Sequence, residues 1–486
     1  MKKIIIITLI IGLYQGSGMA NSLKNSRPNI IFVMTDDQGM GDLSCMGNKI
    51  LKTPHLDAFY KKSTRLTDYH VSPTCAPTRA SIMSGKHEFR VGVTHTILQR
   101  ERMALDIFTL PQALQSANYE TGIFGKWHLG DENEYLPQNR GFDEVFIHGA
   151  GGIGQALGDF KVNRENKYFD NVLLHNETVV QTKGFCTDVF FKAALAWSKK
   201  QLDQKKNFFT YLSLNAPHGP FIAPEKYSKR FSDQGYDEKV AGRYGMIENI
   251  DDNFGILMRK LEEWGALENT MVIFTTDNGM SLSRVVKNGK VATAFNAGMK
   301  GGKNSPYEGG NHVPFFCYWK GVLAEGRDID QLTAHVDLYH TFCELAGVKL
   351  PKDMQKLEGR SFLPLLENNN ATWEDRTLFV HRGRWDTGKM EESKYTAFAV
   401  RTEEWRFENK TELYNINNDP GEQENLIDKH PEIVNKLLPL FEAWWNESKP
   451  YMINENAGKP TGEKPFDVRY KAQEKKGIPL WDAIIE

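Results

Sequence analysis

Near its start the chain reads Asn29-Ile30-Ile31-Phe32-Val33-Met34-Thr35-Asp36-Asp37, an apolar segment that runs straight into two carboxylates. A continuous apolar run is typical of a strand covered on both faces, as in a parallel sheet flanked by helices. Adjacent carboxylates repel each other, and a cation between them would relieve the repulsion. Oxygen ligands favour Ca²⁺ or Mg²⁺ over zinc. The alternative is a solvated Asp-Asp turn without a ligand.

Three further apolar segments end in polar side chains of the same kind. Residues 271–276 lead to Asp277-Asn278-Gly279, residues 208–214 lead to a Pro- and Gly-rich loop with His218, and residues 121–124 lead to Lys126 and His128. In an open parallel sheet the functional groups gather at the carboxyl ends of the strands, so these segments can meet in space. Asp277 and Asn278 would complete the hard-cation site. Each ending also fits an Asx turn or an ordinary surface histidine.

Lysines and histidine in these loops suit an anionic ester. Lys126 and His128 are two residues apart, so they project to the same side of an extended segment. A cation and an imidazole can neutralise charge and transfer a proton. The glycine-dense stretch 300–310 carries Lys303, which suits an oxyanion clamp because glycines let the backbone approach a ligand closely. The alternative for that stretch is a mobile surface loop.

The chain also contains Cys75-Ala76-Pro77-Thr78-Arg79, followed by a short apolar segment that ends at Gly85. Pro77 fits the first turn of a helix and Gly85 fits its end. The free amides of that first turn favour negative charge beside Cys75. The alternative is a small buried thiol.

Together these stretches resemble the formylglycine-dependent type I sulfatases of the alkaline-phosphatase-like superfamily. The resemblance covers about residues 28–426. It rests on blocks in the family's order: Thr35–Asp42, Cys75–Gly85, Gly125–Gly130, Ala216–His218, Thr276–Gly279, Gly302–Gly310 and the tail residues 412–422.

The resemblance implies a set of roles. Cys75 would be oxidised to formylglycine by a sulfatase-maturing enzyme, and Arg79 would steady its hydrate. A Ca²⁺ ion would be bound by oxidised Cys75 with Asp36, Asp37, Asp277 and Asn278. Sulfate oxygens would be held by Lys126 and Lys303, with His128 beside the nucleophile and His218 facing the leaving oxygen. The sequence departs from the family at Gln38, where leucine is common, and at His312, where arginine is frequent.

The resemblance, and the alternation of strands with helices such as residues 244–264, predicts an α/β fold. We expect a large mixed sheet flanked by helices in a catalytic domain of residues 26–366. A smaller α+β subdomain, residues 375–486, would contain an antiparallel sheet near residues 395–401 and 405–408, closed by a helix over residues 431–445. The sequence indicates no role for residues 449–486.

Residues 1–20 have the features of a signal peptide: Lys2 and Lys3, an apolar core, then Gly18 and Ala20. The core is too short to span a bilayer, so we expect an exported protein, periplasmic or secreted, with no membrane segment after cleavage. The net charge of −2 argues against nucleic-acid binding. Five widely spaced cysteines do not form the pattern of a disulfide framework.

An exported member of this family is expected to act on a sulfated carbohydrate. His95, His148 and His312 lie near the reactive blocks in sequence and are candidates for binding the sugar. They are also consistent with ordinary loop histidines. The sequence makes no prediction of the sugar, the sulfated position or the oligomeric state.

Three other functions compete. Gly149-Ala150-Gly151-Gly152-Ile153-Gly154 matches the dinucleotide-binding pattern after an apolar segment, but residues 155–159 make a poor helix start. A phosphodiesterase or phosphonate monoester hydrolase would share the metal and nucleophile arrangement. A sugar-binding protein without turnover would require Cys75 to stay an unmodified thiol.

Overall fold

The central strand is β1 (Asn29–Thr35), and all its residues are buried. The computed structural model describes residues 22–155, 159–457 and 462–483, and the signal peptide predicted for residues 1–20 lies outside them. β1 pairs in parallel with β9 (Thr270–Thr276) on one side and with β8 (Phe208–Ser213) on the other. The buried parallel strand predicted from the apolar run is therefore confirmed.

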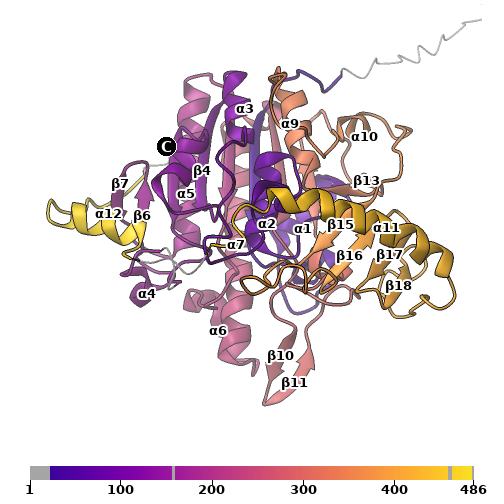
Figure 1. Ribbon diagram of the computed structural model, residues 1–486. Helices are drawn as coiled ribbons and strands as arrows, with labels where there is room; N and C mark the ends of the chain where they lie inside the picture. Colours follow the sequence, from indigo (N-terminus) through magenta and orange to yellow (C-terminus); the bar gives the residue numbers. More distant parts are fainter. Residues whose placement is uncertain (1–21, 156–158, 458–461, 484–486) are drawn as a thin grey trace, which may run out of the picture.

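β1 belongs to a mixed sheet of ten strands (Figure 1). The inner strands β9, β1, β8, β4 and β5 are parallel, whereas β12, β6 and β7 join antiparallel toward the edges. From edge to edge, the order is β13 (Asp328–Ile329), β2 (Thr64–Leu66), β12 (Phe315–Tyr318), β9, β1, β8, β4 (Glu120–Lys126), β5 (Glu144–His148), β6 (Val172–His175) and β7 (Thr178–Gln181).

Helices cover both faces of this sheet. Ile30, Phe32 and Met34 of β1 pack in one apolar cluster, and Ile31 and Val33 pack in another, because successive side chains of a strand point to opposite faces. The first cluster includes α2 (Cys75–Ser84), α3 (Leu110–Ser116), α9 (Asp337–Ala346) and α10 (Leu363–Glu367). The second includes α1 (Pro54–Lys62), α5 (Cys186–Asp203) and α7 (Glu238–Glu263).

A smaller antiparallel sheet follows, as predicted, with the order β15-β16-β17-β18. Its helix α11 (Pro431–Ser448) stacks Phe441 on Phe398, with ring centroids 4.1 Å apart. The strands are β15 (Leu378–His381), β16 (Phe398–Arg401), β17 (Trp405–Glu408) and β18 (Glu412–Asn415). Smaller elements are the pairs β3 (Tyr69–His70) with β14 (Thr333–Ala334) and β10 (Arg284–Lys287) with β11 (Lys290–Thr293), and the helices α4 (Asn163–Asn166), α6 (Glu225–Ser232) and α8 (Glu308–Asn311).

The end of the chain returns to the large sheet. In Figure 1, α12 (Pro465–Glu474) lies at the opposite side of the molecule from α11 and β15–β18. Phe466 packs edge-on against Phe160, and Leu480 bridges to Gln181 of β7. The division at residues 366 and 375 stays a prediction, but this last segment packs with the large sheet rather than with the small one.

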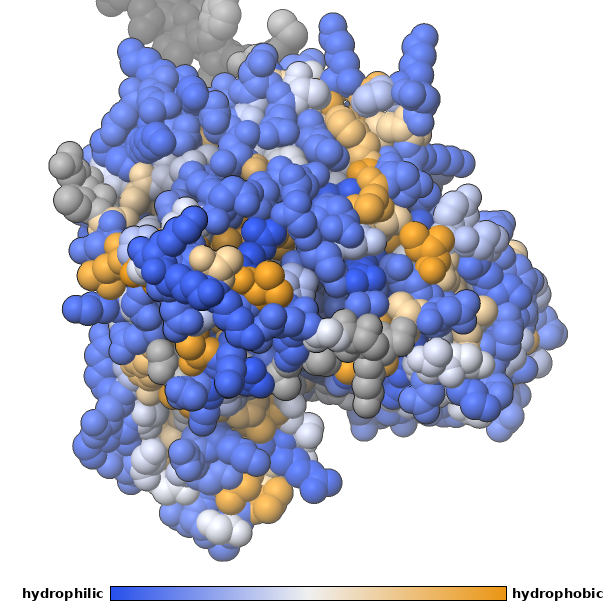
Figure 2. All heavy atoms as spheres, turned by 60° about the vertical axis from the view of Figure 1, so that its left-hand side comes forward, coloured by the Kyte–Doolittle hydropathy of each residue, from blue (hydrophilic) through white to orange (hydrophobic). Residues whose placement is uncertain are grey.

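The described surface is largely polar, and the cysteines are unpaired. Figure 2 shows that the face carrying α12 and β7 is mostly hydrophilic, with hydrophobic side chains in small separate patches. Among the described residues, no helix is both long and apolar enough to cross a membrane. All five cysteines are free thiols.

A buried network of charges joins the small sheet to the segment before β12. Arg406 of β17 lies 2.5 Å from Glu308 and 2.7 Å from Glu408, and all three side chains are almost fully buried. The Arg406 guanidinium also donates to the Pro306 carbonyl and, at 3.0 Å, to Asn311. Three contacts of the small sheet therefore fix residues 306–311.

Replacing Arg406 with methionine should destabilise the protein strongly. The change leaves the buried Glu408 without its arginine and removes one of the two arginines that contact Glu308, the other being Arg401 at 3.2 Å. Removing one partner of a buried ion pair typically costs about 3–5 kcal/mol of unfolding free energy. Urea denaturation should show the loss. Lys429→Met, which removes an exposed partner of Glu424, serves as the control and should leave the midpoint unchanged. Equal midpoints for both variants would contradict the stabilising role of the network.

Candidate active site

Four neighbouring parallel strands end at the same edge of the large sheet. The sheet order β9-β1-β8-β4 places the ends of the four strands that the sequence singled out beside one another. Asp277 and Asn278 follow β9, Asp36 and Asp37 follow β1, His218 lies in the loop after β8, and Lys126 and His128 are at and beyond the end of β4. The structure thus brings these residues together, as the rule for open sheets predicts.

Two carboxylates and a thiol form a compact cluster. The cluster consists of one carboxylate oxygen from Asp36, one from Asp277 and the Sγ atom of Cys75. These three atoms lie within 4.8 Å of one another, and all three residues are buried. Burial raises the pKa of Asp36 to about 7, although Lys126 lowers it. Burial and repulsion from Asp36 raise the pKa of Asp277 to about 6. The protein therefore holds these carboxylates in surroundings that disfavour their charge.

Asn278 and Asp37 complete the oxygen-rich edge of the cluster. Asn278 Nδ2 donates to Asp37 Oδ1 at 3.0 Å, and the backbone N–H of Asp37 donates to Asp277 Oδ1 at 3.1 Å. The oxygens Asp36 Oδ1 and Asn278 Oδ1 are buried without a hydrogen-bond partner among the described residues. Buried oxygens normally have a partner, so a cation between them would satisfy both.

Three cations surround the carboxylates. Arg79 of α2 donates to Asp277 Oδ2 from Nη2 at 2.7 Å and to the Lys126 carbonyl from Nη1 at 3.1 Å. Lys126 Nζ donates to Asp36 Oδ2 at 2.6 Å, and Lys303 Nζ donates to Asp37 Oδ2 at 2.8 Å. Burial alone would raise the pKa of Asp37, but Lys303 and His218 outweigh it and hold that pKa well below its usual range.

Cys75 is the first residue of α2. The helix ends at Gly85, whose φ of 65° is the left-handed conformation that glycine adopts without strain, so both predicted helix ends are confirmed. Burial would raise the pKa of the Cys75 thiol, but the ammonium groups of Lys126 and Lys303 outweigh it and lower that pKa. Cys75 therefore occupies a position that favours negative charge.

The two catalytic candidates among the histidines are held as defined tautomers. His128 donates from Nε2 to the Thr96 carbonyl at 2.8 Å, and its Nδ1 is buried without a partner among the described residues. His218 donates from Nδ1 to the Gly219 carbonyl at 2.7 Å, and its Nε2 lies 3.9 Å from Asp37 Oδ2. Burial lowers the pKa of both rings, for His128 with the nearby Lys126 as a second cause. Each ring thus presents one nitrogen to the site.

The glycine-rich stretch 149–154 packs against these two rings. It follows β5 as a series of turns, and no helix begins there among residues 149–155, so the context of a dinucleotide site is missing. A Cβ at Gly151 would lie 2.4 Å from His128 Cε1, and one at Gly152 would lie 3.2 Å from His218 Nδ1. The glycines therefore allow the loop to approach both histidines.

The three histidines proposed for sugar binding lie in different surroundings, and their role stays a prediction. His148 ends β5 beside Lys126 of β4, is almost fully buried, and has no partner for Nε2 among the described residues. His95 accepts from the amides of Thr96 and Ile97 through Nδ1. The ring nitrogens of His312 are bonded to Glu308 and to the Thr67 carbonyl, at 2.8 and 2.7 Å.

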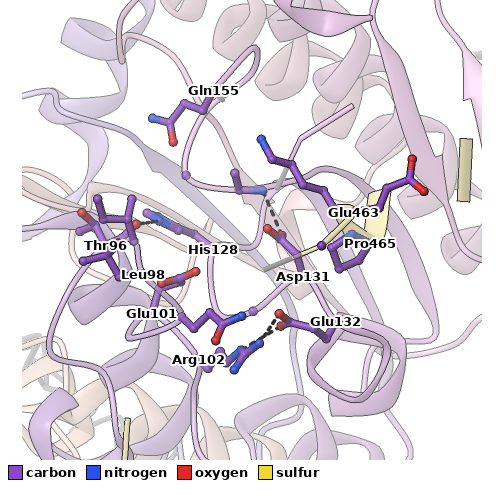
Figure 3. Close-up of a pocket in the computed structure, with 17 residues that line it drawn as sticks. Thr96, Leu98, Glu101, Arg102, His128, Asp131, Glu132, Gln155, Glu463 and Pro465 are labelled. Carbon is purple, nitrogen blue, oxygen red and sulfur yellow. Dashed lines mark hydrogen bonds and ion pairs between the residues drawn. The ribbon is translucent and has the colours of Figure 1, made fainter. Parts of the chain in front are cut away.

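A pocket of about 280 Å³ opens beside His128 (Figure 3). Its walls come from residues 96–102, 128–132, 150–155 and 462–465. Sequence reasoning missed Glu101 and Lys464 because neither lies near a reactive block, and it missed Asp131 although that residue directly follows the block ending at Gly130. It also missed Ser213, whose hydroxyl accepts from Arg79 at the end of β8.

With this geometry in hand, the chain can be compared with known proteins. The sequence model of the family described as Sulfatase matches residues 28–348, and that of the family described as N-sulphoglucosamine sulphohydrolase, C-terminal, matches residues 302–442. The chain belongs to the sulfatase family. This sulfatase is accordingly a sulfuric ester hydrolase with an alkaline-phosphatase-like fold, which confirms the family resemblance and the predicted enzyme class.

Several relatives are similar over most of their length. The sulfatase is 30% identical to the human N-acetylgalactosamine-6-sulfatase over 75% of this chain and 70% of that protein. It is 26% identical to an N-acetylgalactosamine-6-O-sulfatase of Bacteroides thetaiotaomicron over 90% and 97%. The crystal structure of Ps i-CgsB superposes with a TM-score of 0.77 at 27% identity, covering 92% of this chain and 98% of that one.

The phosphonate monoester hydrolase of Agrobacterium radiobacter shares the fold, with a TM-score of 0.60 at 17% identity over 86% of this sulfatase and 96% of that chain. That likeness shows the fold alone. The competing assignment to phosphate or phosphonate esters is therefore not favoured, since the matched family and the relatives named above are sulfatases.

The Gly151→Ala variant should lose activity without losing the fold. The added Cβ would collide with the His128 ring, which must move, and small displacements of catalytic groups cost roughly 10–100-fold in rate. The variant's kcat/KM on 4-nitrophenyl sulfate and its Tm should be measured together. Unchanged kinetics would show that the position of His128 does not matter for the reaction.

Proposed function

We propose that this sulfatase hydrolyses sulfate esters of a carbohydrate, with formylglycine made from Cys75 as nucleophile and with a bound Ca²⁺ ion. The observation that carries the proposal is the position of Cys75, at a helix N-terminus, between two lysines and next to two buried carboxylates. Relatives named for N-acetylgalactosamine sulfates support a carbohydrate substrate. So does the similar structure of Ps i-CgsB in complex with k-i-k-neocarrahexaose, with a TM-score of 0.76 at 27% identity.

The residues at the sheet edge fit a hard divalent cation. Two buried oxygens lack partners among the described residues, on Asp36 and Asn278, and burial raises the pKa values of Asp36 and Asp277. A cation bound by Asp36, Asp37, Asp277 and Asn278 together with the modified Cys75 would satisfy these oxygens and stabilise the charged carboxylates. An all-oxygen set of this kind favours Ca²⁺ over zinc. The ion would act as a Lewis acid on the sulfate group.

Arg79 and the two lysines are positioned to orient the nucleophile and to bind the sulfate oxygens. Formylglycine supplies a hydrated aldehyde as the nucleophile toward sulfur. Arg79 is fully buried and fixed by Asp277, so it can hold a hydroxyl at position 75 in one orientation. Lys126 and Lys303 reach the site from β4 and from the glycine-dense loop, and each ammonium can turn one proton toward a sulfate oxygen.

His218 is the candidate acid for the leaving oxygen. Its Nδ1 proton is committed to Gly219, so Nε2 is the atom that can hold a proton toward the substrate, with Asp37 at 3.9 Å to stabilise the imidazolium. A sugar alcohol is a poor leaving group and needs that proton. His128 presents its bare Nδ1 and can accept a proton or a hydrogen bond beside position 75.

The cellular setting follows from the proposed chemistry. Formylglycine requires a maturing enzyme, which would act on the Cys75–Arg79 stretch before folding buries it. The signal peptide proposed for residues 1–20 would direct export to the periplasm or the medium. There the enzyme would meet sulfated glycans.

The test of the nucleophile is chemical. In protein produced together with a maturing enzyme, mass spectrometry of the peptide containing residue 75 should show an aldehyde in place of the thiol. The Cys75→Ala variant should be inactive, whereas Cys45→Ala should keep its activity because Cys45 is outside the site and burial raises its pKa to about 12. Full activity of protein with an intact Cys75 thiol would refute the proposal.

The test of the cation uses Asp277→Asn. The change removes one negative charge from the cation site and from Arg79, so bound calcium should fall and kcat/KM should drop by about 100-fold or more. Elemental analysis and kinetics report the two effects, and Asp330→Asn, at an exposed carboxylate, is the matched control. Stoichiometric calcium together with unchanged kcat/KM in the Asp277→Asn protein would show that the charge of Asp277 is not needed for the cation site.

A further inference from the structure

The pocket beside His128 carries more acidic than basic side chains. Among its described lining residues, four side chains are acidic and two are basic: Glu101, Asp131, Glu132 and Glu463 against Arg102 and Lys464. Around Cys75 the cations and carboxylates are equal in number, since Arg79, Lys126 and Lys303 each donate to one of the three buried aspartates. The excess of carboxylates is therefore a property of the pocket and not of the nucleophile site.

One acid and one base of the pocket neutralise each other. Arg102 Nε donates to Glu132 Oε2 at 3.0 Å, and a second nitrogen of the same guanidinium bonds to the other carboxylate oxygen. This pairing leaves Glu101 and Asp131 as the half-buried carboxylates of the pocket floor, with Lys464 as the other cation. Figure 3 shows Glu101 and Asp131 at one hollow, with Thr96 and Leu98 on one side and Glu463 and Pro465 on the other.

Glu101 and Asp131 have free acceptor capacity. Glu101 Oε2 is buried and has no hydrogen-bond partner among the residues that the structure describes. Asp131 Oδ1 accepts the Ala150 N–H at 3.0 Å, which ties the carboxylate to the loop that packs on His128. A buried acceptor without a partner is costly unless a ligand supplies the donor. Sugar hydroxyl and amide groups are donors of this kind.

The pocket adjoins the candidate active site at His128. The His128 ring lines the pocket, and Gly151 lies against that ring. The segment after α11 holds the facing wall: Asn454 donates to the carbonyls of Gly92 and Arg102 at 2.9 and 2.8 Å, and residues 462–465 line the pocket itself. A sulfated sugar that reaches position 75 past His128 can place its ring or a neighbouring unit here.

We propose that this pocket is a subsite for a sugar unit without a second negative charge, and that Glu101 and Asp131 exclude a second sulfate or a uronic acid. The proposal rests on the proposed function, since it specifies the substrate of the same site. The carboxylates accept hydrogen bonds from hydroxyl or acetamido groups and repel an added anion. Like charges brought together in a poorly solvated pocket oppose binding.

The ionisation of the two carboxylates sets the assay conditions. Burial raises the pKa of Glu101 to about 7, with repulsion from Asp131 and Glu132 adding to it and Arg102 opposing it. Burial raises the pKa of Asp131 to about 7, with Glu132 adding to it, while the Ala150 N–H, Arg102 and Lys464 oppose it. Carboxylates are charged above their pKa, so discrimination should be measured at about pH 8, where both are mostly ionised.

The experiment compares matched pairs of sulfated sugars on the mature, calcium-loaded enzyme. The two members of a pair share their sugar backbone and the sulfate that is hydrolysed, and one member carries an additional sulfate or a uronic acid. One pair is N-acetylgalactosamine 6-sulfate and its 4,6-disulfate. A second pair is a neocarra-oligosaccharide of lower sulfation and one of higher sulfation. We expect kcat/KM to favour the less charged member by at least roughly tenfold. The Glu101→Gln and Asp131→Asn variants should each reduce that preference several-fold.

Glu134→Gln is the matched control. It removes the same charge from the same part of the chain, but Glu134 is exposed and outside the pocket lining, so the preference should not change. The Tm of each variant shows that it is folded.

Two results would overturn the subsite. One is a wild-type preference for the more charged sugar, and the other is an unchanged preference in both folded pocket variants. Failure of the proposed function looks different: the enzyme would turn over 4-nitrophenyl sulfate but no member of any carbohydrate pair, and the subsite would then fall with it.

Discussion

Buried negative charge at the edge of one sheet is the constraint on which this structure depends. Asp36, Asp37 and Asp277 are buried together because their strands are neighbours, and such a group is stable only if cations reach it. The cations arrive from three distant parts of the chain, namely α2, the end of β4 and the loop before α8. Folding and the assembly of the reactive site are therefore one event.

Much of this could be predicted from the sequence because it depends on local patterns. Apolar runs identified β1, β4, β8 and β9, and the geometry of parallel sheets brought their ends together. Tertiary contacts decided the rest. Gly151 belongs to a nucleotide-like pattern, yet its role is to leave room for His128. His312 lies close to Lys303 in sequence, yet Glu308 engages its ring.

The pocket could not have been predicted for a related reason. Its wall at residues 462–465 comes from the end of a chain that has already built the small sheet and then crossed back to β7. No periodicity or motif in the sequence predicts that the chain crosses back to the large sheet. Its acidic character depends on which carboxylate Arg102 neutralises, and that pairing is visible only once Glu132 is folded beside it. The net charge of a pocket thus depends on which side chains form ion pairs in the fold, and not only on which residue types line it.

The bond network around Arg406 also bears on how this enzyme and its relatives can diverge. The small sheet contributes no candidate nucleophile. Its Arg406 nevertheless donates hydrogen bonds to Pro306 and Asn311, in the segment that follows Lys303. Recombination that replaced the C-terminal part with that of a relative would change these contacts and could displace Lys303, which precedes this segment. We therefore expect the large domain and the small sheet to evolve together at this interface, although they look like separable modules.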